Sequence, residues 1–160
     1  MDYVQSDISS LFAFPAFEPM LHDYADECSI SGLPRPNPNQ EMYCRIEANG
    51  ILDVYLALDG ADLAGFATVL HTVYPHYGLE MSTVESIFVP KAYRSKGAGI
   101  GLLNLIERHA RGTGLFVSAP VGSQFEGVLH GRRYTNTNAV FFLPLGVRDV
   151  TGADRVCAAV

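Results

Sequence analysis

The residues best suited to chemistry lie in the segment VPKAYRSKGAGIG, residues 89–101. Three alternating glycines, Gly97, Gly99 and Gly101, follow directly after two of its cations, Arg94 and Lys96. The first turn of a helix carries unpaired amides and a partial positive charge. Glycine lets an anion approach such amides without a Cβ in the way. The segment therefore favours a pyrophosphate-binding loop, and tight packing of a helix on a strand is the alternative explanation for the glycines.

The elements around this segment must place it between a strand and a helix. Residues 79–89 read as a strand, and a helix is expected from about Ile100 to Arg111, with Ile100, Leu103, Ile106 and Ala110 on its buried face. The other expected elements are a helix at 15–29, a proline-rich loop at 31–39, a helix capped by Asn39 with Met42 in its apolar stripe, a hairpin at 51–74, a buried strand at 115–121, a helix at 123–131 and a strand at 139–145. This order predicts an α/β fold in which helices cover a mixed sheet and the loop leaves the carboxyl end of a strand.

Composition limits the class of protein. The 160 residues carry a net charge of −6, with 48% hydrophobic and 18% charged residues, which is typical of a globular domain. We expect one domain over residues 1–146 and a tail at 147–160. The negative charge argues against nonspecific nucleic-acid binding. Cys28, Cys44 and Cys157 lack zinc-site spacing, so no metal is expected, and the absence of a signal peptide or membrane span predicts a cytoplasmic protein.

A known motif matches the loop. Neither the P-loop pattern nor the dinucleotide GxGxxG pattern fits. Arg94-x-x-Gly97-x-Gly99 resembles the R/Q-x-x-G-x-G/A motif of the GNAT N-acetyltransferases, and FVPKAYR resembles the approach to that motif. The resemblance spans Phe17 to Leu145 and implies a GNAT-like fold, a mostly antiparallel mixed sheet with one splayed parallel strand pair. A looser similarity is to acetyltransferase-like proteins of phages and prophages.

The resemblance implies acetyl-CoA as co-substrate. The implied contacts to the coenzyme pyrophosphate come from the backbone of Arg94, Ser95, Lys96, Gly97, Ala98 and Gly99. The implied contacts to the pantetheine arm come from the strand end, at Ile87, Phe88 and Val89. The helix that begins at Ser123 would lie beside the thioester.

The implied reaction needs a general base for the attacking amine. Glu85 is the predicted base, because a strand carboxylate among apolar neighbours can accept a proton directly or through water. Strict alternation would place it on the same face as Ile87 and Val89. Glu80 is the fallback, and a structural carboxylate is the alternative reading.

The departing thiolate benefits from a proton donor. The family often uses a tyrosine on the helix before a G-F pair, and here that pair reads Arg133-Tyr134. An ungapped count puts Leu129 at the tyrosine position, and a shift of one puts His130 there. His130 and Tyr134 are therefore both candidate acids.

The predicted function is transfer of an acetyl group from acetyl-CoA to an amine by direct attack in a ternary complex. The acceptor is an amine-bearing small molecule or protein, the first two helices would cover its side of the cleft, and His71 and His76 could line its pocket. A homodimer is a further expectation. A non-catalytic GNAT-fold binding module and a nucleotide-binding α/β protein are the alternative classes.

Overall fold

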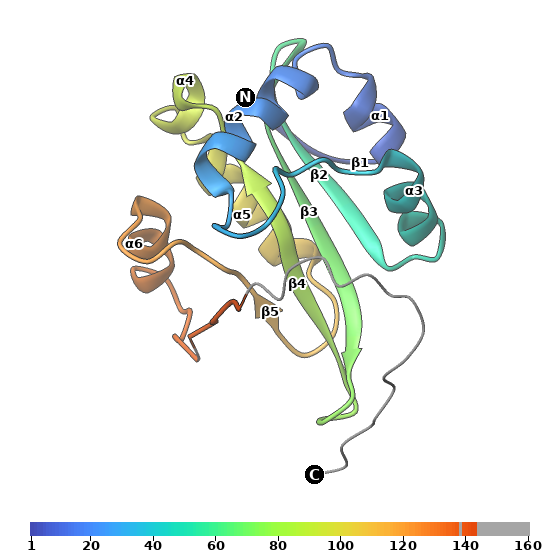
Figure 1. The fold of residues 1–160 in the computed structure, drawn as a ribbon, viewed down its shortest axis with the longest axis vertical. Coiled ribbons are helices and arrows are strands. Elements are labelled where there is room, and N and C mark those ends of the chain that lie inside the picture. Colours follow the sequence, from blue (N-terminus) through green and yellow to red (C-terminus); the bar gives the residue numbers. More distant parts are fainter. Residues whose placement is uncertain (138, 144–160) are drawn as a thin grey trace.

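A five-stranded sheet in the order β1-β2-β3-β4-β5 runs through the protein (Figure 1). Its strands are β1 (Asp2–Ser6), β2 (Leu52–Asp59), β3 (Asp62–Tyr74), β4 (Leu79–Phe88) and β5 (Leu115–Phe116). The pairs from β1 to β4 are antiparallel, and β4 and β5 are parallel. This computed structural model describes residues 1–137 and 139–143, and the predicted domain end at 146 and the tail lie outside them. The sheet confirms the predicted mixed α/β architecture.

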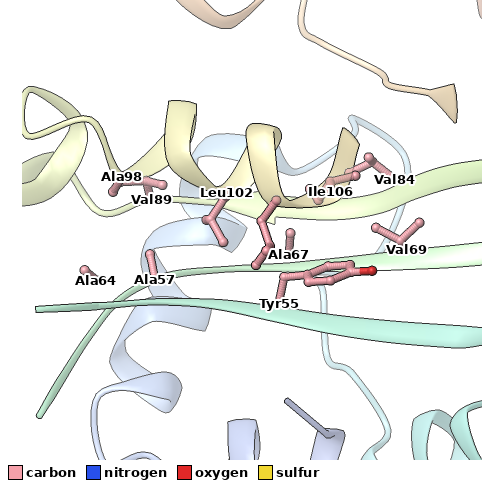
Figure 2. Close-up of a cluster of buried hydrophobic side chains, with 11 residues drawn as sticks. Tyr55, Ala57, Ala64, Ala67, Val69, Val84, Val89, Ala98, Leu102 and Ile106 are labelled. Atoms are coloured by element: carbon pink, nitrogen blue, oxygen red, sulfur yellow. The ribbon is translucent and has the colours of Figure 1, made fainter. Parts of the chain in front are cut away.

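Helices cover both faces of the sheet. They are α1 (Ile8–Ala13), α2 (Phe17–Cys28), α3 (Gln40–Ala48), α4 (Lys91–Arg94), α5 (Ala98–His109) and α6 (Gln124–His130). On one face, α5 packs on small and aliphatic strand residues, and Figure 2 shows Leu102 and Ile106 of this helix lying over Ala67 and Tyr55. The opposite face carries a second core, to which α1 contributes Ile8 and α2 contributes Phe17. No helix in residues 1–137 and 139–143 is long and apolar enough to cross a membrane.

Local signals in the sequence account for several element boundaries. Asn39 caps α3 as predicted, because its side-chain oxygen accepts the amide of Met42 at 3.0 Å. Gly60 has φ +65° at the turn between β2 and β3, a conformation that glycine adopts without strain. Ser123 caps α6 in the same way as Asn39 caps α3, with its hydroxyl accepting the amide of Glu126. The predicted hairpin and both helix starts are confirmed.

The sequence patterns did not predict the two N-terminal elements, β1 and α1. β1 is a short edge strand with no clean alternation of buried residues, and α1 has six residues, so neither leaves a periodic pattern. One signal was present, because Asp7 caps α1 by accepting the amide of Ser10 at 2.7 Å. The chain thus begins with a strand and a short helix and not with the helix expected at 15–29, which forms as α2.

Two predictions about burial were wrong. In α5, Leu103 and Ile106 are buried as predicted. Ile100 is 41% exposed, because the helix starts at Ala98 and turns Ala98 and Leu102 toward the sheet instead. Met42 is 52% exposed, since it borders a cavity instead of the core.

The C-terminal strands also differ from the prediction. The strand expected at 115–121 is half-buried and only two residues long. No strand forms in 139–143, the described part of the strand expected at 139–145. The large apolar side chains of residues 140–143 are exposed. An apolar run by itself was therefore not sufficient for strand formation.

Candidate active site

The loop after β4 forms an open helix start. Gly97 precedes α5 with φ +84°, and a Cβ built there would meet no atom within 4 Å. The first helical hydrogen bond runs from the amide of Gly101 to the carbonyl of Gly97, at 2.9 Å. The amides of Ala98, Gly99 and Ile100 therefore come before the first amide that donates within the helix, as in an anion-binding helix terminus.

The three glycines serve different purposes. A Cβ on Gly101 would lie 1.9 Å from Cζ of Tyr3, so this glycine admits the tyrosine ring of β1. The Tyr3 hydroxyl also donates to the Gly97 carbonyl at 3.2 Å. Gly99 has only an ordinary contact with Val89. Gly101 is therefore explained by tight packing, here of the helix against Tyr3, and the open conformation of the loop depends on Gly97.

Arg94 is engaged by protein groups. Its Nε donates to the carbonyl of Val89 at 2.8 Å, and its guanidinium lies 2.6 Å from Oε2 of Glu27 in α2. Lys91 is 3.9 Å from the same carboxylate. The pairing of Glu27 with Arg94 was not predicted, because the two residues lie 67 positions apart in the sequence. The Val89 carbonyl is also one of the strand-end groups that the family resemblance assigned to the pantetheine arm.

Lys96 lies over the ring of Tyr93, with Nζ 4.7 Å from its centroid. Its Nζ is also 3.8 Å from Oδ2 of Asp59, at the end of β2. The side chain is about half exposed, and the ion pair is a loose one. A diffusing anion would therefore meet an accessible positive charge at this position.

β4 and β5 separate as predicted. They pair at Ser82–Leu115 and Thr83–Phe116, after which β5 ends. β4 continues to Phe88, so the half of the strand that leads into the loop has no partner on that side among the described residues. Ile87 packs against the α5 core, and Phe88 packs in the core on the opposite face.

Glu85 lies on a β-bulge. Thr68 of β3 pairs with Ser86 and its neighbour Val69 pairs with Val84, so Glu85 is an extra residue in β4. Val84 and Ile87 both face α5, although they are three residues apart. The expectation that Glu85 shares a face with Ile87 and Val89 was therefore wrong. The bulge turns its side chain to the opposite face, into the cavity described below.

Hydroxyl groups hold the Glu85 carboxylate. Tyr43 of α3 donates to Oε1 at 3.0 Å, and Thr68 donates to Oε2 at 2.7 Å. Since the Thr68 hydroxyl has one proton, Ser86, 2.7 Å away, donates to Thr68. Burial, followed by the Glu85 charge, raises the pKa of Tyr43. This phenol therefore stays a donor well above neutral pH.

Glu85 borders a cavity of about 420 Å³ on the sheet face covered by α1, α2 and α3. Tyr24, Tyr43, Phe66 and Thr68 line it beside the carboxylate. The loop between α2 and α3 also contributes to its wall. A pocket of this size suits a small molecule, and the carboxylate gives it a base or a cation-binding group.

The two candidate acids lie elsewhere. His130, at the end of α6, is 59% exposed, with Nε2 3.9 Å from Glu126 in the preceding turn. The Tyr134 hydroxyl donates to Oε1 of Glu107 in α5 at 3.1 Å. Burial, and next the Glu107 charge, raise the pKa of Tyr134. Neither residue lines the cavity next to Glu85.

A second polar cluster joins the end of α5 to the sheet. His71 Nε2 is 2.9 Å from Asp53, and its Nδ1 is 3.0 Å from the hydroxyl of Ser82. Arg111, just beyond α5, reaches Asp53 at 2.7 Å, and its amide and carbonyl bond the Ser82 hydroxyl. His71 and Ser82 are buried, so these two side chains cannot contact a substrate, whereas the Arg111 side chain is 42% exposed. Neither His71 nor His76, the two histidines that could line an acceptor pocket, borders the cavity beside Glu85.

Comparisons with known proteins agree with this geometry. A family model described as the acetyltransferase (GNAT) family matches residues 17–124, which is 108 of the 160 residues. No curated protein matches the chain significantly.

Solved structures share the fold at low sequence identity. A ribosomal-protein-alanine N-acetyltransferase from Brucella melitensis biovar Abortus 2308 has 17% identity and a TM-score of 0.66, covering 91% of this chain and 99% of its own. An aminoglycoside acetyltransferase from an uncultured soil metagenomic sample has 13% identity and a TM-score of 0.66, covering 91% and 96%. A probable acetyltransferase has 17% identity and a TM-score of 0.65, covering 92% and 100%.

Proposed function

Because the chain belongs to the acetyltransferase (GNAT) family, we propose that it transfers the acetyl group of acetyl-CoA to an amine, with Glu85 as general base. The observation that carries the proposal is the position of the Glu85 carboxylate. The bulge directs this side chain into the cavity, and the hydroxyls of Tyr43 and Thr68 hold it there. The strand that bears it leads directly into the glycine loop.

The loop fits the phosphates of the coenzyme. The left-handed conformation at Gly97 leaves the N-terminus of α5 open, and Lys96 adds an exposed charge beside it. In the proposal, the backbone of residues 94–99 holds the pyrophosphate, and Ile87, Phe88 and Val89 hold the pantetheine arm along the unpaired end of β4. Bound acetyl-CoA would supply the acetyl thioester.

Within the cavity, the proposed role of Glu85 is to take a proton from the incoming ammonium, directly or through one water. Tyr43 and Thr68 fix the direction of the carboxylate, and a fixed base contributes orientation as well as basicity. Each carboxylate oxygen can accept a further hydrogen bond, so the amine can bind without displacing either hydroxyl.

The proposal assigns the proton for the leaving sulfur to solvent. His130 is exposed, and the Tyr134 hydroxyl is already bonded to Glu107. A free thiol has a pKa of about 8.5, so the sulfur can leave as thiolate and take its proton from water. His130 and Tyr134 remain predictions that single substitutions can check.

The test is Glu85→Gln, which keeps the shape of the side chain and removes its basicity. We expect kcat to fall about 10²- to 10⁴-fold, with acetyl-CoA affinity nearly unchanged and the acidic limb of the pH–rate profile lost. Glu80→Gln, the same change on the same strand, is the control and should retain activity.

Three results would count against the proposal. Wild-type turnover by Glu85→Gln would leave Glu85 a structural residue. Coenzyme binding without turnover on any amine would identify a binding module. Failure to bind acetyl-CoA at all would refute the proposed acetyl donor and the phosphate site in the loop.

A further inference from the structure

We infer that the acceptor is a small monoamine with an apolar, aromatic body, whose ammonium meets Glu85 while its body occupies the 420 Å³ cavity. This inference rests on the proposed acetyl transfer, because it names the substrate of that same site. It derives from the chemistry of the cavity wall, the number of charges in it and the residues at its mouth.

Aromatic side chains form a continuous part of the cavity wall. Phe12 contacts Phe17 edge to face, with ring centroids 4.8 Å apart, and Phe17 contacts Phe66 in the same manner at 5.3 Å. Tyr24 lies tilted to Phe66 at 6.4 Å. All four rings line the cavity. A flat apolar body can add to such edge-to-face contacts, which contribute beyond simple burial.

The number of charges limits the acceptor to one ammonium. Among the described residues that line the cavity, Glu85 is the only Asp, Glu, Lys, Arg or His. Its carboxylate matches one positive charge. A polyamine or an aminoglycoside would place further ammonium groups against phenyl rings and prolines, where an unpaired charge loses its hydration without compensation.

Exposed apolar residues gather at the mouth of the cavity. Ile30 is 52% exposed, Leu33 50% and Met42 52%, and all three line it. Single exposed apolar residues are ordinary, but several around one concave site indicate an apolar ligand. Pro34, Pro36 and Pro38 of the same loop also line the cavity. Proline has a fixed φ, so this wall loses little freedom when a ligand binds.

The experiment compares three amines: 2-phenylethylamine, ethanolamine and spermidine. Their binding to the full chain is measured by calorimetry with coenzyme A present, and their KM by acetyl transfer. We expect 2-phenylethylamine to bind at least about ten-fold more tightly than ethanolamine, from burial of one phenyl group. Spermidine should be no better than ethanolamine. Better binding or turnover of either polar amine overturns the inference and leaves acetyl transfer standing.

Matched variants locate the amine. Leu33→Ser should weaken binding of 2-phenylethylamine about five-fold and leave ethanolamine unchanged. Leu79→Ser makes the same change at a 43% exposed leucine on β4, outside the cavity, and should alter neither. An unchanged Leu33→Ser variant overturns the inference. If 2-phenylethylamine binds with this preference and no amine is acetylated, the site assignment stands and the proposed transfer fails.

Discussion

Replacing Gly97 with valine separates the two properties that this glycine provides, an unstrained turn and an open anion site. Gly97 has φ +84°, and the left-handed region costs an ordinary L-residue about 1–2 kcal/mol. No atom lies within 4 Å of the added Cβ, so the cost is conformational and not steric. In a domain of this size, we expect the melting temperature to fall by about 2–8 °C.

The effect on the coenzyme should be larger. If the loop relaxes to avoid the strain, the amides of Ala98 and Gly99 turn away from the pyrophosphate. A hydrogen bond to a charged group contributes about 1.5–3 kcal/mol, so the loss of one such bond would raise the Kd for acetyl-CoA at least about ten-fold. Calorimetric titration of the wild type and Gly97→Val with acetyl-CoA measures this change directly.

Gly78→Val is the matched control. Gly78 has φ +63° with nothing within 4 Å of its Cβ, and it lies before β4, whose 10 residues span about 30 Å to the loop. We expect a similar fall in melting temperature and an unchanged Kd. If Gly97→Val binds acetyl-CoA as the wild type does, the loop is not the phosphate site.

Three further predictions concern charges and buried groups. Glu27→Gln should tighten acetyl-CoA binding by up to about five-fold at low salt, because Arg94 loses an exposed partner whose pairing is worth about 0.2–1 kcal/mol; weaker binding by titration would contradict this. His71→Ala should lower the free energy of unfolding in urea by about 2–4 kcal/mol, since it removes the bonds of His71 to the buried Asp53 carboxylate and to the buried Ser82 hydroxyl, and a loss under 1 kcal/mol would contradict the network. The raised pKa of Tyr43 means that the folded state keeps its proton while the unfolded state loses it above about pH 10. Stability should therefore fall as pH rises above that value, and less steeply in Tyr43→Phe; equal slopes in alkaline melts would refute this sign.

Much of the fold was readable because its signals are local. The turn at Asp59-Gly60 and the cap at Asn39 act through backbone conformation and hydrogen bonds within a few residues. The N-terminal strand was not readable, since β1 is a polar edge whose register depends on β2. For residues 139–143 the error was the reverse: the apolar run predicted a strand, and none forms there.

The sequence by itself determined the family, the glycine loop and the presence of a carboxylate on the strand that leads to it. Tertiary structure decided what each of these residues faces. The bulge at Glu85 exists because β3 and β4 pair with one extra residue, and it reversed the face that alternation assigned. Glu27 meets Arg94 across 67 positions, and Tyr3 meets Gly97 across 94. Such contacts form only when helices and strands pack together, and no local sequence pattern links the residues that make them.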